Sequence, residues 1–157
     1  MPRLDATRLG AWRDISTRLA ELNRLVDEDL MAEWDIPLGW FDVLAALQRL
    51  DGRARPVEIA AVLRLPPSSV SRRIDRLEEE GWVARHRNVD PDDQRVVEVE
   101  LTRRGRNLWR EMNVTYRRSV QARFATHLTD HDIAGLWRVG DRLRVAEEDA
   151  TIDRHAR

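Results

Sequence analysis

The stretch LPPSSVSRRIDRLEEEGWVAR, residues 65–85, opens with two prolines and three serines and continues into four arginines and four acidic residues. Proline is typical of the first positions of a helix, and glycine of the position just beyond its end. Pro66, Pro67 and Gly81 therefore predict one short helix between them.

The two faces of this helix differ in polarity. Val70, Ile74 and Leu77 recur at the spacing of one helical face and are expected to pack against the core. The opposite face is polar and consists of Ser68, Arg72, Asp75, Arg76 and Glu79. Bases precede acids along it, although the helix dipole favours the reverse by ~0.3–1 kcal/mol per charge. Taken alone, the pattern fits either a solvated surface helix or a helix whose first turns face an anion.

The neighbouring segments favour the second interpretation, because they indicate a winged helix-turn-helix. A helix is expected over residues 38–50, and Pro56 starts a short third one. Downstream, WVARHR and RVVEVELT are separated by the turn-forming NVDPDDQ. The second segment alternates apolar and acidic residues, which predicts a two-stranded β-hairpin.

Long helices are expected on both sides of this unit. The first spans residues 5–33 and carries an apolar seam with the 3-4-3-4 spacing of helix packing, formed by Trp12, Ile15, Leu19, Leu22 and Val26. Thr102 is expected to cap a second long helix, and Thr129 with Asp132 has the spacing of a capping box for the last. The predicted fold is mainly α, an α+β winged helix with six helices and a hairpin wing.

Composition restricts the classes of function. The net charge is −1, which by itself argues weakly against nucleic acid, but residues 53–106 hold 12 arginines against 10 acids. The absence of cysteine excludes disulfides and thiolate metal sites. No signal peptide or membrane-length apolar run is apparent, so we predict a cytoplasmic protein without a membrane partner.

No catalytic motif is found: neither GxSxG, HExxH nor a glycine-rich phosphate loop occurs. The four histidines, His86, His127, His131 and His155, do not form a recognisable metal-binding pattern. The sequence therefore predicts no enzyme activity, no cofactor and no metal.

In a helix-turn-helix, the N-terminal turns of the second helix enter the major groove of DNA. The residues expected there are Ser68, Ser69, Ser71, Arg72, Arg73 and Arg76. In the hairpin, Arg87 and Arg95 are candidates for phosphate or minor-groove contacts. We expect Asp93 to shape the loop and to hold Arg95 by a charged hydrogen bond; a purely structural Asp–Arg pair is the alternative.

At this point the sequence resembles the MarR family of bacterial transcription regulators. The helix matches the family pattern V-[ST]-R-x-[VI]-D-x-L-E-x-x-G-[LW]-[VI]-x-R at Val70, Ser71, Arg72, Ile74, Asp75, Leu77, Glu78, Gly81, Trp82, Val83 and Arg85. The wing and the start of the next helix match at Asp93, Arg95, Leu101, Thr102 and Gly105. One departure is the proline pair, since Pro66 stands where the family often has a small polar capping residue.

The resemblance implies a single MarR-type domain over residues 1–157, with a winged DNA-binding lobe at 37–101 and a helical dimerisation lobe from 1–36 and 102–157. It implies a homodimer with recognition helices about one DNA turn apart, ~34–36 Å, on a pseudo-palindromic operator. The predicted function is a sequence-specific repressor that binds double-stranded DNA. A winged-helix protein-interaction module without DNA binding is the alternative.

Family members are often released from DNA by a small aromatic or phenolic compound. Residues that could line such a crevice here are Trp12, Trp40 and Trp109, with Arg13 as an anchor for an anionic group. Aromatic residues at helical spacing also pack in the hydrophobic core, so a purely structural role remains the alternative for these tryptophans.

Overall fold

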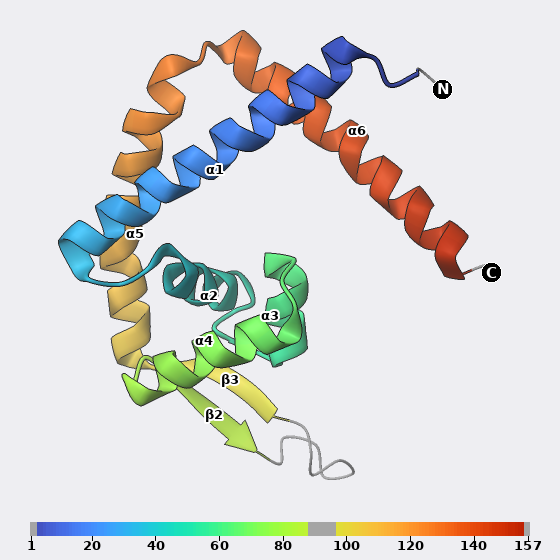
Figure 1. The fold of residues 1–157 in the computed structure, drawn as a ribbon. Coiled ribbons are helices and arrows are strands. Elements are labelled where there is room, and N and C mark those ends of the chain that lie inside the picture. Colours follow the sequence, from blue (N-terminus) through green and yellow to red (C-terminus); the bar gives the residue numbers. More distant parts are fainter. Residues whose placement is uncertain (1–2, 88–96, 156–157) are drawn as a thin grey trace. The chain divides into compact units, whose positions relative to one another are not determined.

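The computed structural model describes residues 3–87 and 97–155, and the side chains of residues 3–86 and 97–144. Two compact units are present, residues 1–120 and residues 121–157. The elements, in chain order, are α1 (Ala6–Trp34), α2 (Leu38–Arg49), β1 (Arg53–Ala54), α3 (Pro56–Leu63), α4 (Pro67–Glu79), β2 (Val83–Arg87), β3 (Val97–Leu101), α5 (Arg103–Arg123), the 3-10 helix η1 (Ala125–His127) and α6 (Asp130–His155) (Figure 1). Six α-helices and a small antiparallel sheet thus confirm the predicted fold class for the described residues.

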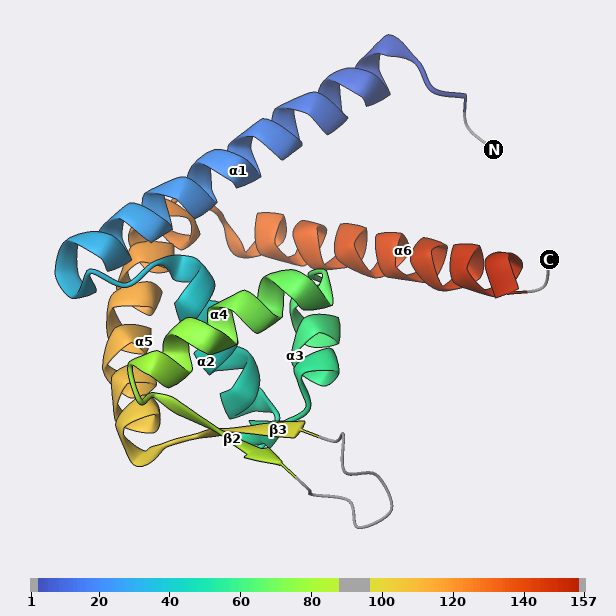
Figure 2. The ribbon, with the colours of Figure 1, turned by 60° about the horizontal axis from the view of Figure 1, so that its bottom comes forward.

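The core of the first unit forms where α2, α3 and α4 pack together over the sheet. α4 lies across α2, and its N-terminal end lies beside α3 (Figure 2). The predicted inner face of α4 is confirmed, because Val70, Ile74 and Leu77 are all 0% exposed. Fully burying an aliphatic side chain contributes ~1.5–3 kcal/mol, so this face fixes how α4 is rotated against the core.

The sheet has one strand more than predicted. β2 and β3 form the expected antiparallel hairpin, but β1 also pairs with β3, Arg53 opposite Glu100 and Ala54 opposite Val99, giving the order β1-β3-β2. The predicted two-stranded wing is confirmed as β2 and β3, and the third strand, β1, was not predicted. A strand of two residues is too short to show an alternating pattern, so only its pairing with β3 identifies it.

Hydrogen bonds hold the residues that follow α4 against the start of α5. Thr102 donates its backbone N–H to the Trp82 carbonyl at 3.1 Å and its hydroxyl to the Gly81 carbonyl at 2.9 Å. The same hydroxyl accepts the Gly105 N–H at 3.0 Å, which confirms Thr102 as the cap of α5. A Cβ on Gly105 would lie 1.9 Å from the Trp82 carbonyl oxygen, so this close approach requires glycine.

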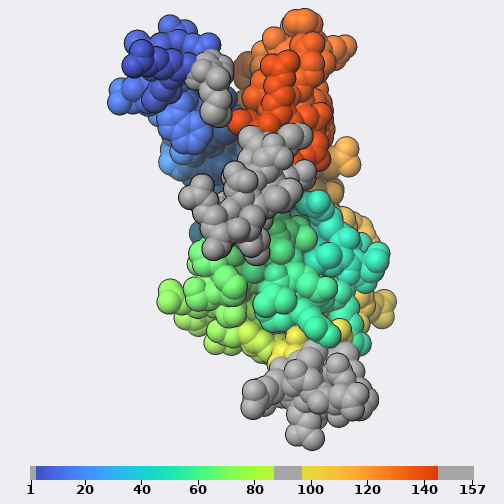
Figure 3. Space-filling view, turned by 90° about the vertical axis from the view of Figure 1, so that its right-hand side faces the viewer, coloured from blue at the N-terminus to red at the C-terminus, as the bar shows by residue number. Residues whose placement is uncertain are grey.

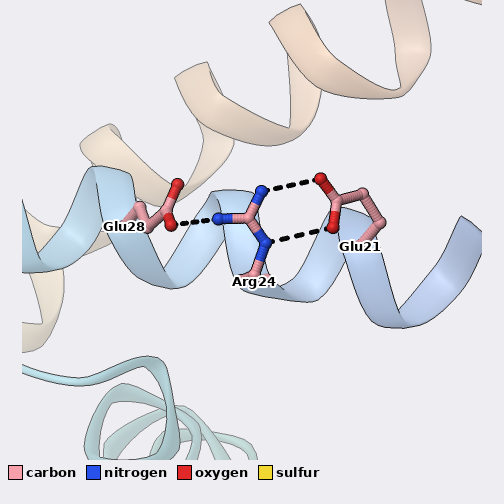
Figure 4. Close-up of polar contacts among 3 residues, drawn as sticks. All are labelled: Glu21, Arg24 and Glu28. Carbon is pink, nitrogen blue, oxygen red and sulfur yellow. Dashed lines mark hydrogen bonds and ion pairs between the residues drawn. The ribbon is translucent and has the colours of Figure 1, made fainter.

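α1 begins as predicted, with the Asp5 carboxylate accepting the Arg8 N–H at 2.8 Å. Its surface is covered by local ion pairs; Arg24 binds Glu21 through two nitrogens, at 2.6 and 3.0 Å, and also binds Glu28 (Figure 4). These hydrogen bonds lower the pKa of Glu21 and raise that of Arg24. Such i,i+3 and i,i+4 pairs support helix in a segment that makes few core contacts.

The predicted seam of α1 is only partly covered within this chain. Val26 is 7% exposed and belongs to a second core cluster with Leu30, whereas Trp12, Ile15 and Leu19 are 68%, 44% and 50% exposed.

In the second unit, the predicted capping box is confirmed by Thr129 N–H to Asp132 at 2.9 Å and Asp132 N–H to the Thr129 hydroxyl at 3.3 Å. α6 exposes several large apolar residues: Leu136, Trp137, Val139 and Leu143.

Candidate nucleic-acid interface

The turn between α3 and α4 is short and holds α4 at the surface. Arg64 ends α3 in the left-handed conformation, with φ 52°, and the Leu65 N–H bonds the Ala60 carbonyl at 3.1 Å. Pro66 occupies the N-cap with φ −57° and ψ 138°, so α4 begins without a side-chain cap. In Figure 3, α3 and α4 form part of the outer surface of a close-packed body. The first turn of α4 is therefore available to a partner.

The outward face of α4 is the one predicted. Ser68, Arg72 and Arg76 are exposed, and Ser69 and Ser71 are partly buried beside them. Within the described part of the chain, Arg72 makes no hydrogen bond or ion pair, while Arg76 bonds Glu79 at 2.8 Å between two exposed side chains. Exposed ion pairs of this kind contribute little free energy, so the guanidinium groups of Arg72 and Arg76 can both bind another partner.

Arg73 differs from its neighbour Arg72. Its side chain is partly buried, and its Nη1 donates to the Gly39 carbonyl in the first turn of α2 at 3.1 Å. Arg73 was predicted to contact DNA together with the other side chains of the outward face. In the structure its side chain instead points toward the protein interior.

The acidic half of α4 has a partner that sequence reasoning missed. Arg85, on β2, forms ion pairs with Asp75 and Glu78, and its backbone N–H donates to Glu78 at 3.1 Å. Burial lowers the pKa of Arg85, but the hydrogen bonds to the two carboxylates outweigh it and raise that pKa overall. Arg85 thus ties the base of the wing to α4, and two of the acids that accompany the arginines along α4, Asp75 and Glu78, serve this contact. The signal was present in the matched motif, which includes all three residues.

The wing itself is described only at its base. Arg87 ends β2, and its side chain, together with residues 88–96, lies outside the described part of the structure. The roles expected for Arg87, Asp93 and Arg95 stay predictions. On the outer face of the sheet, His86 Nε2 lies 2.9 Å from Glu100, and Arg53 pairs with Glu98.

Comparisons with known proteins agree with this geometry. Residues 34–95 match the family model described as the MarR family. The HTH-type transcriptional repressor MdtR of Bacillus subtilis is 31% identical over 106 residues, which are 68% of this chain and 66% of that protein. The multiple antibiotic resistance protein MarR of Escherichia coli is 32% identical over 114 residues, or 73% of this chain and 76% of MarR. The chain belongs to the MarR family.

A solved structure extends the similarity to nearly the whole chain. Sco3205, a MarR family transcriptional regulator from Streptomyces coelicolor crystallised in complex with DNA, superposes with a TM-score of 0.82 at 26% identity, covering 95% of this chain and 91% of Sco3205. As a MarR family member, the chain is a DNA-binding winged-helix transcriptional regulator rather than an enzyme.

The residues expected to line an effector crevice of this MarR family member fall into two groups. Trp40 and Trp109 are partly buried and pack against both core clusters. Trp40 also contacts Trp82 edge-on, with ring centroids 6.1 Å apart. Trp12 and Arg13 are exposed on α1 and belong to neither cluster. The structure therefore brings together Trp40 and Trp109, with Trp82 as a neighbour that the sequence did not suggest.

Trp109 has one further property. Its indole Nε1 is buried and has no hydrogen-bond partner among the described residues.

Across the described residues, no group of three or more His, Asp or Glu side chains could hold a metal ion. None of the described helices is long and apolar enough to cross a membrane.

Proposed function

We propose that this MarR family protein is a homodimeric repressor that binds a pseudo-palindromic operator by inserting the first turns of α4 into the major groove. The observation that carries the proposal is the state of the charges on α4. The carboxylates of Asp75 and Glu78 both pair with Arg85, while Arg72 is exposed and has no partner in the described residues. The helix therefore presents net positive charge at its N-terminal half, where a recognition helix meets base edges.

The proposed contacts follow from the chemistry of each side chain. Arg72 suits a guanine edge, because its planar fork can donate to O6 and N7 together. Ser68, Ser69 and Ser71 can bond phosphate or bases, and Arg76 can exchange its surface pair with Glu79 for a phosphate. In the wing, Arg87 and Arg95 would contact phosphate or the minor groove, with Asp93 holding Arg95.

Exposed apolar residues support the homodimer. Each long terminal helix carries such a stripe: on α1 it is Trp12, Ile15 and Leu19, and on α6 it is Leu136, Trp137, Val139 and Leu143. Large apolar patches of this kind mark interaction surfaces. Their position in the predicted dimerisation segments, 1–36 and 102–157, favours a second copy of the chain as the partner, with the winged lobe at 37–101 left for DNA.

Release by a small aromatic effector is the regulatory part of the proposal. Trp40 and Trp109 supply aromatic surface, and the unpartnered Trp109 Nε1 could donate to a phenolic or carboxylate oxygen. Trp12 and Arg13 of α1 are the other residues assigned to this site. MdtR, a relative named as a repressor, supports repression as the sense of regulation.

The test is selection of bound duplexes from a random-sequence library, followed by affinity measurements on the enriched sequence. We expect a motif with dyad symmetry and half-sites about one helical turn apart. Arg72→Ala should weaken binding by about 5- to 150-fold for each half-site, as expected for loss of a bidentate base contact worth ~1–3 kcal/mol in each subunit, and should relax preference at one position per half-site.

The matched control is Arg18→Ala, which removes the same charge from an exposed position on α1 paired only locally with Asp14 at 3.6 Å. It should bind like the wild type. Failure to enrich any motif at low salt would favour the protein-interaction module, and unchanged affinity of Arg72→Ala would overturn the contact assigned to that residue.

A further inference from the structure

Arg73 is held in a site inside the protein that is built around a glycine. Its Nη1 donates to the Gly39 carbonyl at 3.1 Å. A Cβ added at Gly39 would meet Cζ, Nη1 and Nη2 of Arg73 at 3.0, 3.1 and 3.2 Å. The guanidinium group therefore lies directly over Gly39, and the contact depends on the absence of a side chain there.

One carboxylate interacts with this guanidinium group, and a second carboxylate acts on the first. Asp42, one turn further along α2, is partly buried, and the charge of Arg73 acts on it to lower its pKa. Burial raises that pKa more strongly, and Asp27 of α1 adds to the rise. Asp27 in turn accepts the Leu38 N–H at 2.6 Å, which supplies the cap that Pro37 lacks at the start of α2. The first turn of α2 is thus held by α1 on one side and by Arg73 of α4 on another.

We propose that Arg73 is a positioning residue for DNA binding, which sets the orientation of the recognition helix by anchoring α4 to Gly39 in the first turn of α2. The inference rests on the proposed function and assigns Arg73 a role different from that of Arg72. Movement of Arg73 to DNA would leave the Gly39 carbonyl without this donor and Asp42 without its nearby positive charge. The carbonyl keeps its hydrogen bond within α2, but losing a charge-assisted hydrogen bond and leaving a partly buried carboxylate without its nearby positive charge is costly. Arginine suits the role because its planar group can lie flat over a glycine while donating at its edge.

The salt dependence of operator binding separates a positioning residue from a contact. A side chain that neutralises a phosphate releases counterions, so its loss from both subunits of the proposed homodimer reduces the slope of log K against log salt by ~1.8, which is ~0.9 per contact. We expect Arg73→Gln to bind the duplex selected by the wild type about tenfold more weakly, because a charge-assisted hydrogen bond is lost. The slope and the base preference at every position should stay as in the wild type. Arg76→Gln, the same change three residues along the same helix, should instead reduce the slope.

A second variant tests the site without touching any charge. Gly39→Ala crowds the guanidinium group and should reproduce the weaker binding of Arg73→Gln. The double variant should bind no more weakly than Arg73→Gln alone, because both changes break one contact and their effects are not additive. Thermal unfolding of each variant checks that the fold persists, and Gly39→Ala keeps the test valid if Arg73→Gln does not fold.

The outcomes distinguish the two proposals. If the wild type selects no sequence, the proposed function fails whatever Arg73 does. If the wild type binds but Arg73→Gln lowers the salt slope by ~1.8, which is ~0.9 per subunit, Arg73 is a phosphate contact and the inference is overturned. Wild-type affinity of Gly39→Ala, or additive losses in the double variant, would overturn it as well.

Discussion

Leu44 and Ile74, in the winged lobe, are both 0% exposed, whereas Trp12 on α1 and Trp137 on α6 are 68% and 72% exposed. Both kinds of region have apolar residues at helical spacing, but the winged lobe buries them within one chain, whereas the exposed stripes of α1 and α6 are not covered in this way. A lobe that covers its own apolar face can be stable by itself, whereas a helix with an exposed apolar stripe gains stability by association. This difference distinguishes the DNA-binding winged lobe from the exposed stripes of α1 and α6, for which we propose dimerisation.

The largest expected effect concerns the core of the winged lobe. Ile74→Ala should lower the free energy of unfolding by ~2–5 kcal/mol, because it removes buried apolar surface and leaves a cavity. The measurement is chemical denaturation of the purified protein. Val57→Ala in α3 is the control, since Val57 is 60% exposed, and it should leave stability nearly unchanged. Equal losses in the two variants would show that burial does not distinguish these positions.

An intermediate effect is expected for the exposed stripe of α1. Trp12→Ala should raise the dissociation constant of the dimer by about 30-fold or more, the consequence of removing an interface tryptophan worth ~2 kcal/mol. Sedimentation across a dilution series measures this constant. Val114→Ala is the control, because Val114 on α5 is 65% exposed but lies outside the two stripes. If Trp12→Ala dimerises like the wild type, α1 is not part of the interface.

The smallest effect should appear in the pH dependence of stability. Burial, with the nearby Asp27, raises the pKa of Asp42 above its ordinary 3.8 despite Arg73, and the pKa of Tyr116 is raised by burial and then by the charge of Asp42. The folded state then holds the Asp42 proton more tightly than the unfolded state. This contribution to stability is complete below the ordinary pKa and is lost as pH rises through the folded pKa. In Asp42→Asn the side chain cannot ionise, so this variant should not show that loss of stability as pH rises.

Thermal unfolding of the wild type and Asp42→Asn from below pH 3.8 to neutral pH tests this sign. The wild type should lose stability relative to the variant as pH rises. Parallel curves would mean that the folded and unfolded states hold this proton equally, and a relative gain by the wild type would mean that the attraction of Arg73 outweighs burial.

Local patterns were sufficient for most of the architecture. The boundaries of the first four α-helices, the hairpin, the cap at Thr102 and the capping box at Thr129 were predicted, because each depends on residues within a few positions of one another. The ion pairs of Arg85 with Asp75 and Glu78 were missed, although all three residues stood in the matched motif. Their pairing depends on β2 folding back along α4, which no local spacing encodes.

The sequence by itself determined which face of α4 is buried, because a helical period is a property of the chain, and the positions of Val70, Ile74 and Leu77 follow from it. Only the tertiary structure decided what the adjacent Arg72 and Arg73 do. The two are chemically identical, and successive residues differ by about 100° around a helix of 3.6 residues per turn. The packing of α4 against Gly39 of α2 therefore gives Arg73 an internal partner and leaves Arg72 exposed.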